Sequence, residues 1–130
     1  RHSVALFDGS TLGKIEVIGP QAAAFVDFLY YNTMSTLKPG RCRYGFMLSE
    51  NGVVFDDGVL VRLDEHRFVV SCSSSHVTLV HARLEEWRQD RFGRGAVYIH
   101  NATSDMATLT VSGPNARKLL EALDLGLSLG

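Results

Sequence analysis

Two adjacent carboxylates inside an apolar stretch are the side chains of this sequence best placed to do chemistry. Asp56 and Asp57 stand between the apolar residues 53–55 and 59–61. Aspartate is a poor strand former, yet its neighbours favour a strand, in which alternation sends one carboxylate to each face. One carboxylate is then desolvated beside Phe55 or its cross-strand neighbours, which is costly unless it is hydrogen-bonded or paired. Carboxylates held at such a cost often mark a site of acid–base chemistry.

A structural interpretation of the same residues stays open. Asp56, Asp57 and Gly58 are also typical of a bulge or turn in which both carboxylates face solvent. Three arginines on or beside the nearby strands could pair with them, namely Arg41, Arg43 and Arg62. An open apolar cleft at the carboxylate would favour an enzyme, whereas an arginine pair would favour a structural role.

Other common motifs are absent from the sequence. Residues 9–14 superficially suggest a phosphate loop, but their glycine spacing is one residue short, and Ile15 replaces the magnesium-binding Ser or Thr. Residues 73–75 are serines without the GxSxG context of a nucleophile, so we interpret them as helix N-caps. No metal site is expected, because metal-ligand spacing is lacking among the five histidines, His2, His66, His76, His81 and His100.

The composition is that of one soluble globular domain. The chain has 130 residues, 45% apolar and 21% charged, with a formal net charge of -1. This charge lacks the basic footprint of a nucleic-acid binder, and no stretch is typical of a membrane span or a secretory signal. Cys42 and Cys72 form neither a CxxC motif nor a disulfide framework, which is typical of two reduced packing cysteines. We therefore expect a cytoplasmic protein.

The elements that must position the carboxylates begin with a hairpin. Residues 43–49 and 53–63 predict two strands joined by Glu50, Asn51 and Gly52. Asn-Gly between two such runs is a strong hairpin signal, because both residues tolerate positive φ. A third strand is predicted over residues 67–71.

A helix and two further strands follow the hairpin. The helix would bury one face, made of Val77, Val80, Leu84 and Trp87, and strands are predicted over residues 96–100 and 106–112. Residues 15–22 and 109–116 repeat one pattern, a strand, then Gly-Pro, then a helix. The order β-α-β-β-β-α-β-β-α predicts an α+β domain with helices packed on a largely antiparallel sheet.

Several short segments, taken in order, resemble a known family across essentially the whole chain. The folate-binding aminomethyltransferases, the family of the glycine-cleavage T-protein, are similar in residues 6–10, 15–20, 50–52, 56–57, 68–71 and 111–114. Within that family, residues 8–15, 40–45 and 55–58 are most similar to the C-terminal half of the alpha subunits of heterotetrameric sarcosine oxidases. The resemblance implies the N-terminal portion of the aminomethyltransferase folate-binding fold.

This resemblance implies a chemistry and a set of site residues. In the family, tetrahydrofolate captures a one-carbon unit from an oxidised methylamine as methylenetetrahydrofolate. The functional aspartate of the T-protein falls on Asp57, near the folate amines, which makes Asp57 the expected catalytic residue. The expected folate-lining residues are Leu12, Tyr44, Val70 and Cys72. Cys72 stands where the T-protein has asparagine, so one pterin hydrogen bond differs.

The resemblance also implies partners and further cofactors. We expect an oxidoreductase complex in which other sarcosine oxidase subunits are partners, and in which FAD, FMN and NAD belong to other parts. The family's module is longer, and its downstream Gly-Tyr-x-Gly-Glu segment, which supplies a glutamate to the pterin, is not in this sequence. Residues 1–130 are therefore expected to be a single domain, a fragment of a larger module that is inactive alone. The alternative is a non-catalytic scaffold or subunit-assembly module of the same fold.

Overall fold

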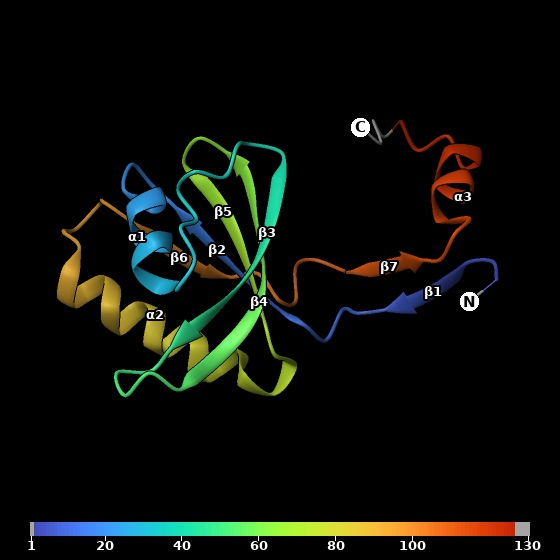
Figure 1. Ribbon diagram of the computed structural model, residues 1–130. Helices are drawn as coiled ribbons and strands as arrows, with labels where there is room; N and C mark the ends of the chain where they lie inside the picture. The colour runs from blue at the N-terminus through green and yellow to red at the C-terminus, as the bar shows by residue number, and fades with distance from the viewer. Residues whose placement is uncertain (1, 127–130) are drawn as a thin grey trace. The chain divides into compact units, whose positions relative to one another are not determined.

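The computed structural model describes residues 2–126, which divide into two compact units (Figure 1). Residues 12–106 form the larger unit, and residues 2–11 with 107–126 form the smaller one. Within the described residues every pair of neighbouring strands is antiparallel, which confirms the predicted α+β class. The single domain expected over residues 1–130 stays a prediction.

The larger unit is a five-stranded sheet with two helices, and its strand order is β3-β4-β5-β2-β6. The strands are β2 (Gly13–Ile18), β3 (Arg41–Leu48), β4 (Val54–Asp64), β5 (Arg67–Cys72) and β6 (Tyr98–Asn101). The helices are α1 (Ala22–Leu29) and α2 (Val77–Arg91), and the 3-10 turn η1 (Ser74–His76) precedes α2. The predicted hairpin, third strand and helix are thus confirmed, with boundaries shifted by a few residues.

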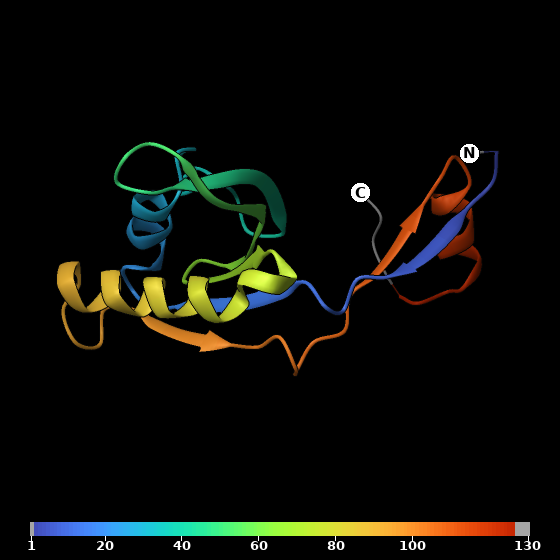
Figure 2. The same cartoon turned by 90° about the horizontal axis from the view of Figure 1, so that it is seen from below.

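The core lies between one face of this sheet and the helices, which run beside the sheet in Figures 1 and 2. The sheet contributes Ile15, Leu60 and Val70, and the helices contribute Phe25 and Leu84, all fully buried. Burying one such side chain contributes about 1.5 to 3 kcal/mol. The helices therefore cover this face of the sheet, and the opposite face of β3, β4 and β5 is left to solvent.

Helix α2 packs as its periodicity predicts, but its start differs from the prediction. Val80 and Leu84 are buried, and Val77 and Trp87 pack partly buried against the core. Neither η1 nor α2 has a side-chain N-cap hydrogen bond, so the prediction that Ser73 caps the helix with its side chain is wrong. Its hydroxyl donates elsewhere, to a carboxylate on β4.

Between β3 and β4, the amide of Ser49 donates to the carbonyl of Val53 at 2.8 Å and closes a three-residue loop, in which only one residue has positive φ. The amide of Gly52 donates to the carbonyl of Ser49 at 2.9 Å, and Gly52 has φ of 79°. Asn51 is not among the residues with positive φ, so the turn uses the left-handed conformation at Gly52 alone of the Asn51-Gly52 pair. A turn followed by a left-handed glycine is the usual form of such a loop.

A β-bulge at Phe55 resets the alternation of β4 just before the two carboxylates. Met47 pairs with Asp56, but the next residue of β3, Leu48, pairs with Val54, which leaves Phe55 unpaired. Phe55 packs against Trp87 of α2, and Asp56 is buried. The bulge therefore lets both Phe55 and Asp56 point to the helix-covered side.

The smaller unit is a two-stranded ribbon with one helix. β1 (Ala5–Asp8) pairs with β7 (Leu109–Ser112), and α3 (Ala116–Ala122) follows β7. The predicted order lacked β1, whose partner strand comes from the other end of the sequence. No side chain of residues 2–11 or 107–126 belongs to the buried core.

The repeated Gly-Pro pattern forms the same local structure in both units. Gly19 and Gly113 have φ of 139° and 131°, which favours glycine. A Cβ on Gly19 would lie 2.5 Å from the carbonyl oxygen of Ala96, and a Cβ on Gly113 would collide with the carbonyl of Ser3. In each unit the glycine thus lets an adjacent backbone segment approach the strand-to-helix turn.

Candidate functional site

The helix-free face of the sheet carries a carboxylate bound to a tyrosine. Asp57 on β4 is half-buried, and Tyr44 on β3 is 57% exposed. The Tyr44 hydroxyl donates to Oδ2 of Asp57 at 2.5 Å. This hydrogen bond raises the pKa of Tyr44 above its ordinary value, so the phenol stays a donor at neutral pH. The pair presents an oriented carboxylate at the surface of the sheet.

The neighbouring carboxylate points to the opposite face and is satisfied there. Asp56 is 4% exposed. Its Oδ1 accepts from the amide of Asp57 at 2.9 Å and from the Ser73 hydroxyl at 2.6 Å, and its Oδ2 accepts from the Ser73 amide at 3.1 Å. The expectation of one carboxylate per face is confirmed, and the buried one is Asp56.

Of the three arginines proposed as ion-pair partners, Arg43 and Arg62 bind elsewhere. Arg43 donates to the carbonyl of Thr33 and, at 3.0 Å, to the hydroxyl of Thr36. Arg62 donates to backbone carbonyls, including that of Leu37 at 2.7 Å. Within residues 2–126 no arginine forms an ion pair with Asp57.

The backbone pairing between strands β4 and β5 ends before Asp57, although the two strands stay in contact. Their ladder of paired residues ends at Leu60 and Val70. Beyond it, the Ser71 hydroxyl donates to the carbonyl of Val59 at 2.9 Å and accepts from the amide of Val59 at 2.8 Å. A Cβ on Gly58 would collide with the backbone of Ser71, so glycine is needed at this position. Side chains thus replace the backbone ladder where the carboxylates lie.

A buried tyrosine that the sequence did not single out lies beneath this point. Tyr30 is 5% exposed, and its ring lies against Gly45, where a Cβ would be 3.0 Å from Cδ1 of the ring. Its hydroxyl has no hydrogen-bond partner within residues 2–126. Burial, with smaller contributions from Cys72, Asp56 and Asp57, raises the pKa of Tyr30 well above its ordinary value. The phenol therefore stays neutral.

The other predicted folate-lining residues lie away from Asp57 and Tyr44. Val70 and Cys72 are 0% and 2% exposed, on the helix-covered side of β5. Leu12 is 42% exposed and precedes β2, which β5 separates from β4. The structure thus brings together Asp57 and Tyr44 alone of the five predicted site residues. The folate roles of all five stay predictions.

The two cysteines differ in environment. Both are free thiols, and Cys42 is exposed whereas Cys72 is buried. The prediction of a packing cysteine is therefore wrong for Cys42. Burial, then the charge of Asp56, raises the pKa of Cys72 to about 11, while Lys14 acts in the opposite direction. The Cys72 thiol is consequently neutral at physiological pH.

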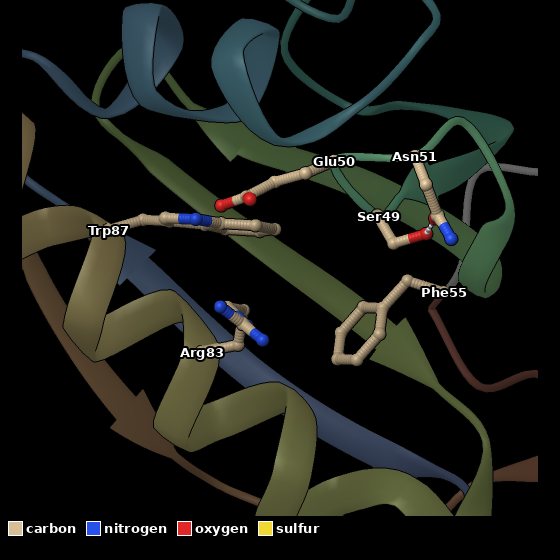
Figure 3. Close-up of a pocket in the computed structure, with 6 residues that line it drawn as sticks. All are labelled: Ser49, Glu50, Asn51, Phe55, Arg83 and Trp87. Atoms are coloured by element: carbon tan, nitrogen blue, oxygen red, sulfur yellow. Dashed lines mark hydrogen bonds between the residues drawn. The ribbon is translucent and has the colours of Figure 1, made fainter.

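A pocket of about 340 Å³ opens between the β3–β4 turn and α2 (Figure 3). Its lining residues are Ser49, Glu50, Asn51, Phe55, Arg83 and Trp87. The Arg83 guanidinium lies 5.6 Å from the centre of the Trp87 ring and 3.2 Å from Glu86. Ser49 donates to Asn51 at 2.6 Å. Arg83, Ser49 and Asn51 thus already have partners. Phe55 packs against Trp87 of α2, so the pocket lies on the helix-covered side of the sheet, opposite to Asp57.

Two further features bear on the kind of site. Among residues 2–126, no group of three or more His, Cys, Asp or Glu side chains is arranged to hold a metal ion. In the same part of the chain, no helix has the length and hydropathy that a membrane crossing needs.

The fold is an antiparallel sheet with helices on one face and an oriented aspartate on the other. Comparison with known proteins identifies the family that has this fold. The GCVT N-terminal domain matches residues 1–128, and the chain belongs to this family. The alpha subunit of sarcosine oxidase from Corynebacterium sp. (strain P-1) is 40% identical over 129 residues, covering 99% of this chain and 13% of that protein. An aminomethyltransferase from Corynebacterium aurimucosum is 34% identical over 123 residues, covering 95% and 32%.

A solved structure agrees with these sequence matches. The crystal structure of the glycine cleavage system aminomethyltransferase T from Bartonella henselae superposes with a TM-score of 0.79 at 30% identity, covering 98% of this chain and 33% of that one. The predicted family and fold are thereby confirmed. The chain spans about a third of the aminomethyltransferases and a smaller part of the sarcosine oxidase subunits that it matches.

Proposed function

We propose that the sheet face carrying Asp57 and Tyr44 is part of a tetrahydrofolate site in a protein of the sarcosine oxidase alpha type. There the one-carbon unit of oxidised sarcosine would be captured as methylenetetrahydrofolate. The observation that supports this most is the Tyr44 hydrogen bond, which holds the Asp57 carboxylate on an uncovered face. The similarity to sarcosine oxidase alpha subunits and aminomethyltransferases supports it as well.

The chain's own residues would act on the amines of the folate. Tetrahydrofolate supplies the nitrogen atoms that take up the carbon. Asp57 would accept a hydrogen bond from one of them or exchange a proton with it, and Tyr44 would keep the carboxylate oriented. General acid–base or electrostatic assistance of this kind is worth about 10²- to 10⁴-fold in rate. Leu12 is open to a ligand, whereas Val70 and Cys72, buried on the helix-covered side of the sheet, would act by shaping it.

The proposal extends to the whole complex. Other sarcosine oxidase subunits are the expected partners, FAD, FMN and NAD belong to other parts of the complex, and the cytoplasm is the expected compartment. Residues 1–130 would be a fragment of the larger folate-binding module, inactive alone. The scaffold alternative expects Asp57 to pair with Arg41, Arg43 or Arg62, and within residues 2–126 Asp57 binds Tyr44 instead, so the contacts of Asp57 give the scaffold alternative no support.

Substitution of Asp57 in the full-length complex tests this function. Asp57→Asn keeps the shape of the side chain but removes its charge, so we expect methylenetetrahydrofolate formation to fall about 10²- to 10⁴-fold. Flavin-dependent oxidation of the amine should continue and release formaldehyde. Both products are measured from one preparation. Asp90→Asn, an exposed carboxylate on α2, is the matched control and should change neither product. An unchanged methylenetetrahydrofolate yield in Asp57→Asn would contradict the proposal.

A further inference from the structure

We propose that Asp56 is a positioning residue, which holds the backbone of β4 so that Asp57 faces the proposed folate site. This inference rests on the proposed function, because it explains how the carboxylate of Asp57 is held toward the proposed folate site. The Asp56 side chain is buried on the opposite face of the sheet and contacts Asp57 only through the Asp57 backbone amide. Its action is therefore through Asp57.

The backbone of β4 has one paired neighbour at this point instead of two. On the β3 side, Asp57 pairs with Phe46. On the β5 side, the ladder has already ended at Leu60 and Val70. A strand paired on one side has fewer hydrogen bonds to fix its direction, and one residue of slippage moves a side chain to the other face. The direction of Asp57 consequently depends on other contacts.

Asp56 supplies such contacts between the two strands beyond the end of their pairing. One carboxylate oxygen accepts from the Asp57 amide at 2.9 Å and from the Ser73 hydroxyl at 2.6 Å. The other accepts from the Ser73 amide at 3.1 Å. Ser73 follows β5 directly, so the carboxylate joins the Asp57 backbone to the end of β5 where the two strands no longer pair. We call these three hydrogen bonds the Asp56 clamp.

The clamp needs a carboxylate. Both oxygens of Asp56 face donors, two of them on Ser73 and one on the Asp57 amide. An asparagine presents one acceptor and one NH2 donor, so its NH2 group would face at least one N–H or O–H donor. Asp56→Asn thus breaks the clamp without creating a cavity. Ser73→Ala removes only the hydroxyl hydrogen bond, and Ser73→Thr keeps a hydroxyl in place.

The first measurement is hydrogen exchange in the full-length holoprotein. In Asp56→Asn, peptides that cover residues 56–59 should exchange about tenfold faster or more, because the opening of this segment costs less free energy. Ser73→Ala should give a smaller increase in the same peptides, and Ser73→Thr should restore the original rate. Unchanged exchange in Asp56→Asn would overturn the proposal.

The second measurement is the division of product between methylenetetrahydrofolate and formaldehyde, at a temperature where each variant is folded. Misplacing a reacting group by about 1 Å can cost on the order of 10²-fold, so we expect Asp56→Asn to lower the maximal methylenetetrahydrofolate yield by about 10- to 100-fold. The tetrahydrofolate concentration at half-maximal yield should change little, because Asp56 does not touch the ligand face. Ser73→Thr should retain the original yield.

A second carboxylate of the same kind provides the matched control. Asp27 on α1 accepts from the amides of Met34 at 2.5 Å and Ser35 at 2.7 Å, so it also fixes a backbone segment, but not the one that carries Asp57. Asp27→Asn should lower stability and leave the division of product unchanged. An equal loss of yield in Asp27→Asn and Asp56→Asn would mean general destabilisation and would overturn the proposal.

The variants separate the two proposals. If Asp57→Asn abolishes methylenetetrahydrofolate formation while Asp56→Asn retains it, only the positioning role is overturned. If Asp57→Asn itself retains the yield, the proposed function fails, and the positioning role fails with it.

Discussion

At the scale of single residues, the adjacent carboxylates Asp56 and Asp57 of β4 lie in different surroundings. Asp57 binds one tyrosine at the uncovered face, while Asp56 is buried and accepts three hydrogen bonds. Alternation along a strand predicts this division from sequence alone. The identity of the buried partner was not predictable, because Ser73 reaches Asp56 only after β4 and β5 are folded against each other. From sequence alone, the three consecutive serines at 73–75 instead predicted N-caps of the following helix.

The cysteines provide a prediction at this scale. In the native full-length protein, iodoacetamide should modify exposed Cys42 much faster than buried Cys72. The pKa of Cys72 is raised to about 11, so at pH 8 or 9 few of its thiols are ionised, and its thiolate fraction should grow only as pH rises toward 11. Peptide mass spectrometry follows each site, and the denatured protein, in which both should react alike, is the control. Equal rates for the two cysteines in the native protein would contradict the structure.

At the scale of elements, local sequence patterns predict the individual strands and helices better than they predict how the strands pair. The hairpin, the third strand and the buried face of α2 follow from periodicity and from Asn51-Gly52. The bulge at Phe55 and the short strand β1 do not, because both exist only through pairing with other strands. Of the candidate site, Asp57 was predictable, while its separation from Val70 and Cys72 required the register of the sheet.

The hairpin provides the element-scale prediction. Gly52 has φ of 79° and open space around it, so a side chain there is strained by the backbone and not by collision. Gly52→Val should lower the free energy of unfolding by more than about 1 kcal/mol, because a β-branched residue is strongly disfavoured at positive φ. Gly93→Val is the matched control, since Gly93 has equal room and an ordinary φ. Urea unfolding measures both variants, and equal stabilities would show that the turn is placed wrongly.

At the scale of the whole molecule, the two units differ in what they bury. Among residues 2–126, all the buried apolar side chains lie between residues 15 and 102, in the larger unit. The smaller unit repeats the strand, Gly-Pro, helix pattern without a core, although a two-stranded ribbon is only marginally stable alone. The aminomethyltransferases that the chain matches are about three times as long. A complete folate pocket is therefore expected only in the longer protein.

The last prediction concerns binding by residues 1–130 alone. The proposed tetrahydrofolate site includes Asp57 and Tyr44, but this sequence lacks the glutamate that the resemblance places downstream on the pterin. Each polar ligand group left unpaired costs roughly 1 to 3 kcal/mol, and 1.4 kcal/mol is about tenfold in affinity. Calorimetry should thus show that the fragment binds tetrahydrofolate at least about tenfold more weakly than the full-length protein does. Asp57→Asn in both proteins serves as the control for specific binding, and equal affinities of the two unsubstituted proteins would refute the prediction.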